Sequence, residues 1–245
     1  MTKSEIRDSS SEILLPKHLA VIMDGNGRWA QARGKNRSYG HKQGAEAVRP
    51  IVTECAKLGL EALTLYSFST ENWTRSQDEI DVLMDLYVSY LQSERGLFMD
   101  NNVKLVQIGR REGLPQRVLD ALDGMAEDTA KHDGLTLALA INYGSRAEIT
   151  DAVRAIARKA AEGALAPGQI TEATVADHLY TAGLPDPDLL VRTAGELRLS
   201  NYLLWQLSYA ELYVTEACWP DFTVQELHKA FAAFKGRVRR FGGVV

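Results

Sequence analysis

The residues best suited to chemistry are Asp24 and Arg28, with Gly25 and Gly27 between them. They directly follow an apolar run at residues 19–23, which is typical of a buried strand in a parallel sheet. A strand, a glycine turn and a helix start leave backbone N–H groups free to bind an anion. Asp24 would repel that anion unless a cation joined the two, so the turn predicts Mg²⁺ between Asp24 and a phosphate. The alternative is an ordinary turn in which Asp24 caps the helix.

A run of positive charge follows this turn. Residues 28–42 contain no acid, although the whole chain carries a net charge of −4. Their basic residues are Arg28, Arg33, Lys35, Arg37, His41 and Lys42. Such a run is usually a solvated face, but beside a phosphate-type turn it would attract a polyanion.

A second polar stretch, residues 65–75, leaves the next predicted strand at the same sheet edge. Its polar side chains are Ser69, Glu71, Asn72 and Arg75. Asn72 could orient a substrate or take up a proton on its amide oxygen, and Arg75 could hold a phosphate through two hydrogen bonds. The alternative is a polar loop with Trp73 packed beneath it.

A third stretch, residues 191–201, follows a later strand. The residues spaced to surround a second anion are Arg192, Arg198 and Ser200. The alternative is an arginine-rich loop that pairs with Glu196. Further on, Glu211 opens a strand; a lone glutamate there is more often a surface residue than a metal ligand, unless Asp24 needs a partner.

Apolar strand-like runs alternate with helical patterns along the chain. Strands are predicted at residues 19–23, 62–67, 103–108, 135–141, 189–192 and 211–215. Helices are predicted at residues 80–91, 118–130, 151–161, 174–180 and 227–238, with capping boxes at Ser76 and Thr223. Pro50 indicates a kink or a late start in an earlier helix, and residues 163–169 form a surface loop. The alternation predicts one α/β domain, a mostly parallel sheet with helices on both faces.

The helix at residues 80–91 carries an apolar stripe. Its members are Ile80, Leu83, Met84, Tyr87, Val88 and Leu91. A stripe at this spacing is usually core, but beside two anion sites it could wall a tunnel for a long apolar tail. Small residues at Ser67, Ala138 and Ala140 would leave space for that tail. Two anion sites, a metal carboxylate and an apolar wall together fit a diphosphate ester with an apolar tail.

Composition sets the remaining limits. The 245 residues, 45% hydrophobic and 24% charged, are typical of a soluble domain with a substantial core. Cys55 and Cys218 have no metal-ligand spacing and favour a reduced cytosolic setting.

Residues 1–16 are polar and lack the apolar core of a signal peptide, so we expect a flexible tail before a single domain at residues 17–245. No apolar run is long enough to span a bilayer. A pI near 5.8 and the absence of a P-loop disfavour nucleic acid or nucleotide binding.

With these motifs in place, the chain resembles the cis-prenyltransferase (isoprenyl transferase) family, and within it the bacterial undecaprenyl diphosphate synthases. The segments that match are residues 18–29, Gly40-His-Lys-x-Gly44, residues 63–75, Asn142-Tyr-Gly-x-Arg146, residues 192–206, residues 209–213, Trp219-Pro-Asp-Phe222 and residues 239–243. The resemblance implies a homodimer whose subunit has a central six-stranded sheet surrounded by helices, with an apolar tunnel.

The resemblance also implies a reaction. Isopentenyl diphosphate would be added repeatedly to an allylic diphosphate, farnesyl diphosphate above all, with Mg²⁺ as cofactor and each new double bond cis. The expected product is a long-chain polyprenyl diphosphate, most of all undecaprenyl diphosphate for the lipid carrier of cell-wall synthesis. We expect a cytoplasmic protein that touches the inner face of the membrane peripherally for product release.

Functional residues of the family carry over position by position. The catalytic residues would be Asp24 and Asn72, and the Mg²⁺ ligands Asp24 and Glu211. The allylic diphosphate would be held by Gly25, Asn26, Gly27, Arg28, Arg37 and His41. Further substrate contacts would be Trp29, Ser69, Thr70, Glu71, Trp73 and Arg75. The isopentenyl diphosphate would be held by Arg192, Arg198, Leu199 and Ser200. Arg240-Phe241-Gly242 resembles a C-terminal signature that can help complete the neighbouring subunit's site.

Two departures from the family pattern stand out. Relatives place a metal-binding histidine where this chain has Leu197, and often a proline where it has Asn36. Leucine cannot bind Mg²⁺, so water and substrate oxygens would have to complete the metal shell with Glu211. The alternatives are a synthase of shorter products and a non-catalytic accessory subunit, against which the retained Asp24 and Asn72 argue.

Overall fold

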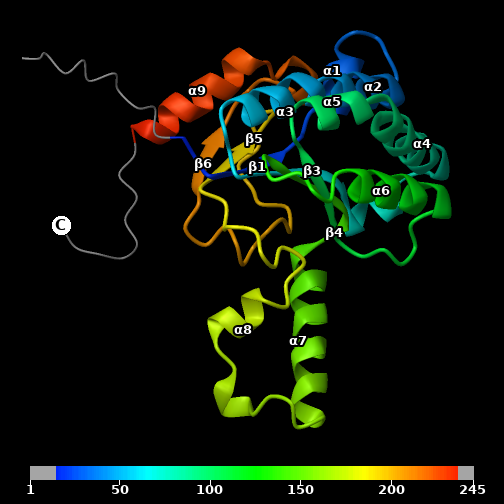
Figure 1. Ribbon diagram of the computed structural model, residues 1–245. Helices are drawn as coiled ribbons and strands as arrows, with labels where there is room; N and C mark the ends of the chain where they lie inside the picture. Colours follow the sequence, from blue (N-terminus) through cyan, green and yellow to red (C-terminus); the bar gives the residue numbers. More distant parts are fainter. Residues whose placement is uncertain (1–14, 237–245) are drawn as a thin grey trace, which may run out of the picture.

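A computed structural model describes residues 15–236 of the chain. One sheet contains six strands in the order β3-β4-β2-β1-β5-β6, and its strand pairings are all parallel (Figure 1). The strands are β1 (His18–Ile22), β2 (Ala62–Ser69), β3 (Lys104–Ile108), β4 (Thr136–Tyr143), β5 (Leu189–Arg192) and β6 (Glu211–Val214). The predicted strands are confirmed. Residues 1–14 of the predicted tail, and the signature at Arg240-Phe241-Gly242, lie outside the described residues.

One face of the sheet is covered by helices, which lie above it in Figure 1. The helices that bury side chains against this face are α3 (Val48–Lys57), α4 (Gln77–Ser93), α6 (Gln116–Asp128) and α9 (Val224–Lys235). Their apolar sides meet strand residues such as Leu19 and Leu63, both fully buried. This layer holds the larger hydrophobic core.

The other face of the sheet is covered mainly by irregular chain. Tyr202 is fully buried there and stacks on Tyr66 with ring centroids 4.3 Å apart. Ala138 and Ala140 lie in the same cluster, so the strands present small side chains that leave room for these rings. We expected helices on both faces. Here only the first turns of α7 (Ser145–Ala161) are well buried, and the covering layer comes largely from residues 179–207.

Helix starts follow the capping signals. Ser76 and Thr223 accept the backbone N–H groups of Glu79 and Glu226, as predicted. α2 (Arg37–Glu46) ends just before α3, which places Pro50 in the first turn of α3, where a missing N–H costs no hydrogen bond.

The remaining short helices are α1 (Asn26–Gln31), α5 (Arg95–Asp100), α8 (Glu172–Ala176) and the 3₁₀ turns η1 (Thr70–Thr74), η2 (Pro167–Gln169) and η3 (Trp219–Asp221). The predicted boundaries were wrong for α7, which begins at residue 145, and for α8, which ends at residue 176.

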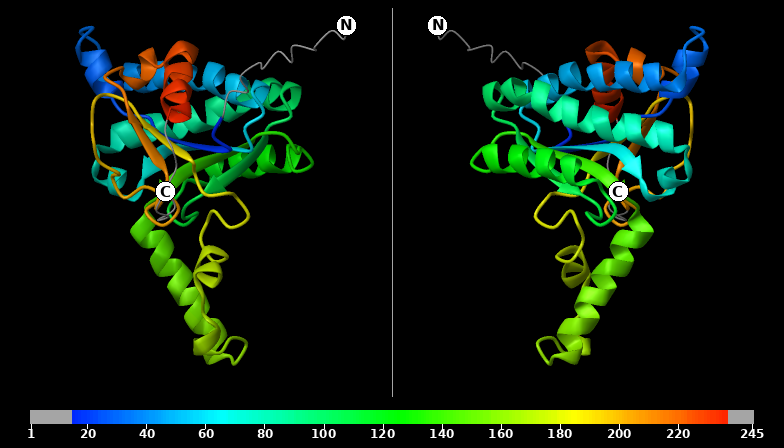
Figure 2. Two further views of the ribbon diagram at one scale, coloured as in Figure 1. Left: turned by 90° about the vertical axis from the view of Figure 1, so that its left-hand side faces the viewer. Right: turned by 90° about the vertical axis from the view of Figure 1, so that its right-hand side faces the viewer.

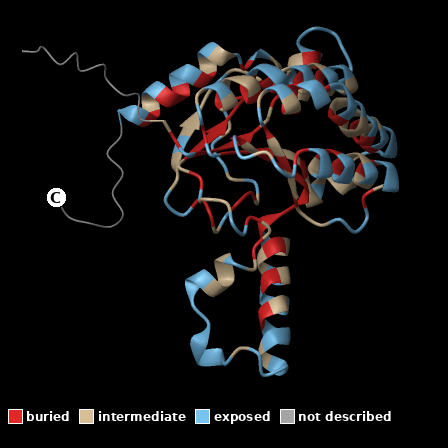
Figure 3. Ribbon diagram, viewed as in Figure 1, coloured by how far each residue is buried: buried red, intermediate tan, exposed pale blue. Residues whose placement is uncertain are grey.

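α7, η2 and α8 form an arm that projects from the body of the molecule (Figure 2). The outer part of the arm is exposed, and the predicted surface loop at residues 163–169 lies at its tip (Figure 3). Among the described residues, none of the helices combines the length and the apolarity needed to cross a bilayer.

Candidate active site

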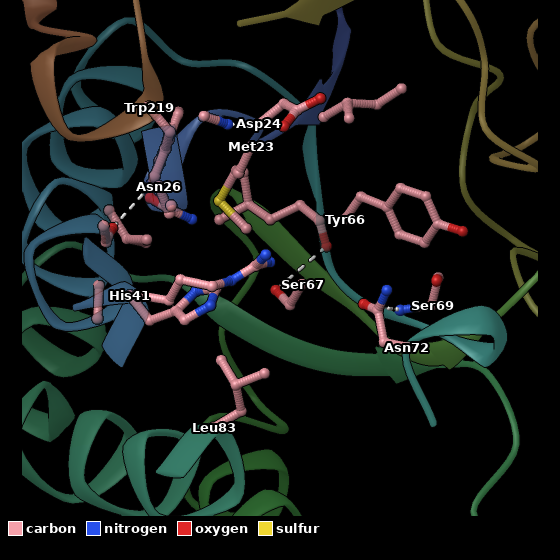
Figure 4. Close-up of a pocket in the computed structure, with 18 of the residues that line it drawn as sticks. Met23, Asp24, Asn26, His41, Tyr66, Ser67, Ser69, Asn72, Leu83 and Trp219 are labelled. Atoms are coloured by element: carbon pink, nitrogen blue, oxygen red, sulfur yellow. Dashed lines mark hydrogen bonds between the residues drawn. The ribbon is translucent and has the colours of Figure 1, made fainter. Parts of the chain in front are cut away.

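A cavity of about 590 Å³ lies where β1, β2 and β5 reach their carboxyl ends (Figure 4). That is the edge at which open α/β sheets bind ligands, and the volume is within the range of small-molecule sites. The predicted site residues that line it are Asp24, Gly25, Asn26, Gly27, Arg28, Arg37, His41, Ser69, Asn72, Arg75, Arg192, Arg198 and Ser200. The structure therefore brings the three polar stretches of the sequence together.

Five residues form a charged group at this cavity, the Asp24 cluster: Asp24, Arg28, Arg192, Glu196 and Arg198. Arg192 donates to Asp24 Oδ2 at 2.8 Å. Guanidinium nitrogens of Arg28 and Arg198 lie 3.8 Å and 3.9 Å from the Asp24 carboxylate. Glu196 contacts both of these arginines, at 3.2 Å from Arg28 Nη1. Three guanidinium groups thus share two carboxylates, which leaves net positive charge for an anion.

The backbone of Asp24 is fixed while its side chain stays accessible. Thr193 Oγ1 accepts the Asp24 N–H at 2.8 Å and donates to the Asp24 carbonyl at 2.7 Å. The Trp219 N–H donates to the same carbonyl at 2.9 Å. The Asp24 side chain is 30% exposed. Because α1 has Gly25 at its N-cap and no side-chain cap, Asp24 does not act as the helix cap that the alternative interpretation required.

Glycines allow α1 and α2 to approach closely. A Cβ on Gly40 would lie 2.1 Å from the Asn26 carbonyl oxygen, and one on Gly44 would lie 2.3 Å from Asn26 Oδ1. Gly25 has φ +97°, a conformation that favours glycine. This packing sets α2, with Arg37 on it, against the turn that carries Asp24.

Arg192 organises the loop that follows β5. Its side chain is only 5% exposed, and Nη1 donates to Ser200 Oγ at 2.8 Å and to the Arg198 carbonyl. The Tyr66 hydroxyl donates to the Ser200 carbonyl at 3.2 Å. The Arg198 side chain is 56% exposed. Of the two predicted clamp arginines, Arg192 therefore holds the loop, whereas Arg198 is exposed and can reach a ligand from its ion pairs with Glu196 and Asp24.

A second charged group, the Glu79 cluster, consists of Glu79, Arg37, His41 and Arg75. Glu79 Oε1 lies 3.4 Å from Arg37 Nη2, 3.2 Å from His41 Nε2 and 2.9 Å from Arg75 Nη1. Burial alone would raise the pKa of Glu79, but the His41 hydrogen bond and the charges of Arg75 and Arg37 lower it overall. Burial lowers the pKa of His41 despite this carboxylate, so the ring is a neutral donor at neutral pH.

Asn72 and Ser69 face the cavity from η1 and the end of β2. Asn72 Oδ1 accepts the Ser69 N–H at 3.0 Å (Figure 4). A carbonyl oxygen has two lone pairs, so Asn72 Oδ1 can accept a second hydrogen bond.

The other predicted residues of this turn do not line the cavity. Trp73 packs edge-on against Phe68 at 5.0 Å and donates to Asn142 Oδ1 at 2.8 Å, so it lies beneath the loop as the alternative predicted. Glu71 accepts from Asn201 at 2.8 Å and from Thr70, which ties η1 to the loop after β5. Thr70, Glu71 and Trp73 therefore make contacts that support the loop in this structure, and their predicted contact with substrate stays a prediction.

The inner part of the cavity is apolar. Its lining here includes Leu65, Leu139, Leu83, Leu86 and Tyr87. The predicted stripe of α4 thus divides: Leu83 and Tyr87 line the cavity, whereas Met84 and Leu91 are buried core.

Of the small residues predicted to leave room for a tail, only Ser67 lines this cavity. The prediction was wrong for Ala138 and Ala140, which lie in the cluster on the other sheet face. Successive strand residues point to opposite faces, so Leu139 faces the cavity and its two neighbours cannot.

Glu211 is not beside Asp24 within this chain. It pairs with Leu189 at the start of β6, and Leu189 pairs with Leu19 at the start of β1, whereas Asp24 follows the end of β1. One subunit therefore cannot place both carboxylates on one ion, because parallel strands put these positions at opposite sheet edges. Among the described residues, no three His, Cys, Asp or Glu side chains gather to hold a metal ion.

Three further positions lie off the main cavity. Trp29 stacks on Tyr39 with centroids 6.0 Å apart and lies under Arg33. Leu197, with 79% exposure, and Leu199 line a separate apolar hollow of about 150 Å³ beside β6.

Sequence reasoning missed the organising residues. Glu79 was interpreted only as part of a capping box, and its ion pair with Arg75 carries no helix-face signal, because Arg75 lies before α4 begins. Thr193, which fixes Asp24, carries no signal beyond its place after Arg192. Tyr66 could be read only as a strand residue.

This α/β protein has two cationic clusters at the mouth of a partly apolar cavity. Such a site is suited to an enzyme that transfers an apolar group from one diphosphate ester to a second one. The model of a family described as "Putative undecaprenyl diphosphate synthase" matches residues 22–242. The isoprenyl transferase of Geobacillus kaustophilus is 47% identical over 250 residues, which cover 100% of this chain and 97% of that protein. The isoprenyl transferase of Fusobacterium nucleatum is 46% identical over 230 residues, which cover 94% and 97%. The chain belongs to this cis-prenyltransferase family, and its activity is prenyl transfer.

Solved structures agree with the family. A lavandulyl diphosphate synthase from Lavandula x intermedia, in complex with dimethylallyl diphosphate, has a TM-score of 0.92 and 38% identity, covering 94% of this chain and 99% of that one. A probable undecaprenyl diphosphate synthase from Campylobacter jejuni has a TM-score of 0.76 and 37% identity, covering 93% and 99%. The predicted family and its six-stranded parallel sheet flanked by helices are confirmed.

Proposed function

We propose that the protein adds isopentenyl diphosphate repeatedly to an allylic diphosphate, farnesyl diphosphate above all, and forms a cis double bond at each addition. One observation carries the proposal: two separate cationic clusters meet at a cavity whose inner wall is apolar. Two clusters suit two diphosphates, and the apolar wall suits a growing hydrocarbon tail.

We assign the allylic diphosphate to the Gly25–Gly27 turn with Arg37 and His41, and isopentenyl diphosphate to Arg198 and Ser200. As the allylic C–O bond breaks, negative charge moves onto the leaving diphosphate. The guanidinium group of Arg37 and the backbone N–H groups of the turn would stabilise that charge, and groups held in place beforehand do so without reorganising. The alkene of isopentenyl diphosphate then attacks the allylic carbon, and we assign to Asn72 Oδ1 the uptake of the proton that is lost.

Asp24 fits Mg²⁺ as a single accessible carboxylate. Mg²⁺ is commonly held by one or two carboxylates together with substrate phosphates and waters, and one exposed carboxylate beside an anion site meets that description. Bound there, Mg²⁺ would neutralise charge on the leaving diphosphate. Leu197 adds no ligand, so the site depends on substrate oxygens.

For the product we propose a long polyprenyl diphosphate, with undecaprenyl diphosphate, a carrier for cell-wall synthesis, as the main species. We further propose a homodimer that touches the membrane peripherally to release this product. A short-chain synthase is the second candidate, because the TM-score of 0.92 joins this chain to a lavandulyl diphosphate synthase.

Product analysis tests the proposal. The purified protein is incubated with Mg²⁺, farnesyl diphosphate and excess isopentenyl diphosphate, and product lengths are measured by mass spectrometry. We expect many successive additions; a stop after one or two would establish the short-chain alternative.

A single substitution tests the role of the cavity. Ser67→Leu should shorten the products, because Ser67 lines the cavity and a larger side chain would fill it. Ser93→Leu makes the same change at an exposed position at the end of α4 and should leave product length unchanged.

A further inference from the structure

Two consecutive residues of the loop after β5 have an unusual backbone conformation. Ser200 and Asn201 have φ angles of 50° and 59°, in the left-handed region that residues other than glycine seldom adopt. Such a conformation persists only where surrounding contacts hold it. Ser200 lines the cavity, whereas Asn201 does not. The contacts of Asn201 therefore help to set where the loop presents Ser200.

Asn201 binds the start of α7 through two acceptors. Its carbonyl oxygen accepts the Ser145 N–H at 2.8 Å, and its Oδ1 accepts the Arg146 N–H at 2.9 Å. The N-cap of α7 is Gly144, which has no side chain to offer, so Asn201 satisfies two N–H groups that a helix start leaves free. Ser145 is fully buried, and its Oγ accepts the Leu204 N–H at 3.0 Å. The buried start of α7 therefore anchors this loop.

The side-chain amide of Asn201 also reaches the turn after β2. Its Nδ2 donates to Glu71 Oε1 at 2.8 Å, and Glu71 belongs to η1, directly before Asn72. A Cβ on Gly144 would lie 2.9 Å from Asn201 Nδ2 and 2.5 Å from Thr70 Oγ1, so the three segments meet with no space for a further side chain. One amide therefore joins the loop after β5 both to α7 and to the turn that carries Asn72.

We propose that Asn201 is a positioning residue for isopentenyl diphosphate. Anchored on α7, it sets where the loop presents Arg198 and Ser200. Through Glu71 it sets where η1 presents Asn72. One molecule of isopentenyl diphosphate would offer its diphosphate to the loop and its proton to η1, so a small displacement between the two segments weakens productive binding. This inference rests on the proposed function, which assigns isopentenyl diphosphate to this loop.

Replacement by aspartate tests the hydrogen bond to Glu71. Asn201→Asp keeps the acceptors for the α7 N–H groups and adds a negative charge, which a helix start favours. It removes the N–H donor and places a second carboxylate against Glu71. KM for isopentenyl diphosphate should rise about fivefold, while KM for the allylic diphosphate should stay within about twofold of the wild-type value. Initial rates with one substrate varied at a time provide both constants.

A second substitution should restore the bond. When Glu71→Gln is combined with Asn201→Asp, the roles are exchanged, because the amide now lies at position 71 and donates to the carboxylate at position 201. KM for isopentenyl diphosphate in the double variant should return to within about twofold of the Glu71→Gln value. Two residues with separate structural roles would instead give additive losses.

The matched control is Asn102→Asp. Asn102 also has a positive φ, 52°, and its Nδ2 also donates to a carboxylate, Asp133 Oδ1, at 2.8 Å. These residues precede β3 and β4, and neither of them lines the cavity. The control makes the same chemical change and should keep both KM values, whatever its effect on the unfolding temperature.

Gly144→Ala tests the same contact without a change at Asn201. The φ of Gly144 is −161°, which suits any residue, so only the added methyl group matters. That group must push away the Asn201 amide and the Thr70 hydroxyl. The same selective rise in KM for isopentenyl diphosphate is expected, and this variant decides the question if Asn201→Asp does not fold.

The outcomes separate clearly. A wild-type KM for isopentenyl diphosphate in Asn201→Asp would overturn the inference, and so would an equal rise of both KM values. Failure of Glu71→Gln to restore KM, or the same rise in Asn102→Asp, would also overturn it. A wild-type protein that consumes no isopentenyl diphosphate would overturn the proposed function and this inference together. A wild-type protein that elongates normally keeps the proposed function whatever these variants show.

Discussion

The Asp24 cluster and the Glu79 cluster are each a carboxylate surrounded by cationic side chains, but the two carboxylates differ in accessibility. The Asp24 side chain is 30% exposed and lies in a turn at the end of β1. The Glu79 side chain is 14% exposed, lies on α4, and has three partners on a single oxygen. By exposure, Asp24 is the more accessible of the two carboxylates to another charged ligand.

This difference separates two tasks. The less exposed carboxylate, Glu79, serves as a counter-ion, because it holds arginines in place and reduces the repulsion between them. An accessible carboxylate beside a net positive charge can join a cation and a diphosphate in the reaction itself. We therefore expect substitutions at Asp24 to affect turnover and substitutions at Glu79 to affect substrate binding.

The largest effect should come from Asp24. Asp24→Asn should lower kcat by about a hundredfold or more, because stabilisation of the leaving diphosphate is lost while the hydrogen-bonding shape remains. The measurement is steady-state kinetics at saturating substrate and Mg²⁺. Near-normal kcat would remove Asp24 from the metal role.

Asp24→Ala should lose as much activity and should also lose stability, since Arg192 is buried and would lack its carboxylate. The control is Asp221→Asn, which breaks an exposed pair with Arg33 and should keep both kcat and the unfolding temperature.

The second-largest effect should be on KM, and it should show which of the two substrates each cluster binds. Arg198 and Arg37 form a matched pair, because their side chains are 56% and 54% exposed and each belongs to one cluster. Arg198→Ala should raise KM for isopentenyl diphosphate, and Arg37→Ala should raise KM for the allylic diphosphate, each about tenfold or more. Initial rates with one substrate varied at a time provide the measurement. An identical rise in both KM values for both variants would show a single shared site.

Much of this arrangement could be predicted from the sequence. Strand positions follow from short apolar runs, and the parallel sheet follows from their alternation with helices, so the polar residues after β1, β2 and β5 were expected at one edge. Asp24, Asn72 and Arg198 were found in this way. The sheet face to which a strand side chain points depends on the strand register, however. Without the register, Ala138 and Ala140 could not be assigned to one face or the other.

Contacts between distant elements could not be predicted. Nothing in a single sequence joins Glu79 on α4 to Arg37 on α2, or Thr193 to Asp24, because these contacts depend on how α2, α4 and the loop after β5 pack. The resemblance placed Glu211 in the metal site, yet the strand order puts it at the opposite edge in this chain. A residue role transferred from a family can depend on a second copy of the chain, as in the proposed homodimer, whereas the strand register describes a single chain.

A smaller effect should come from Glu79. Glu79→Gln keeps the size of the side chain but removes the charge that holds Arg37 and Arg75. KM for the allylic diphosphate should rise a few-fold, about 1 kcal/mol, with kcat nearly unchanged. Asp81→Asn on the same helix, where Asp81 accepts from Gln77 at the surface, is the control. A fall in kcat as large as that of Asp24→Asn would mean that the two carboxylates share one role.

The smallest effect concerns pH. The folded-state pKa of Glu79 is lowered from 4.5, so its contribution to stability is complete above about pH 4.5 and is lost as pH falls through the lower folded value. The wild-type protein should therefore unfold a few degrees higher than Glu79→Gln at pH 7, since about 1 kcal/mol corresponds to about 2–4 °C at this length. The difference should shrink progressively below pH 4.5. The lowered His41 pKa reduces the stability of the wild-type protein itself as pH falls below 6.5, because the unfolded chain takes up that proton first. Unfolding temperatures measured from pH 7 to pH 3 would show it, and a difference that stayed constant over this range would mean that Glu79 is not held ionised by its partners.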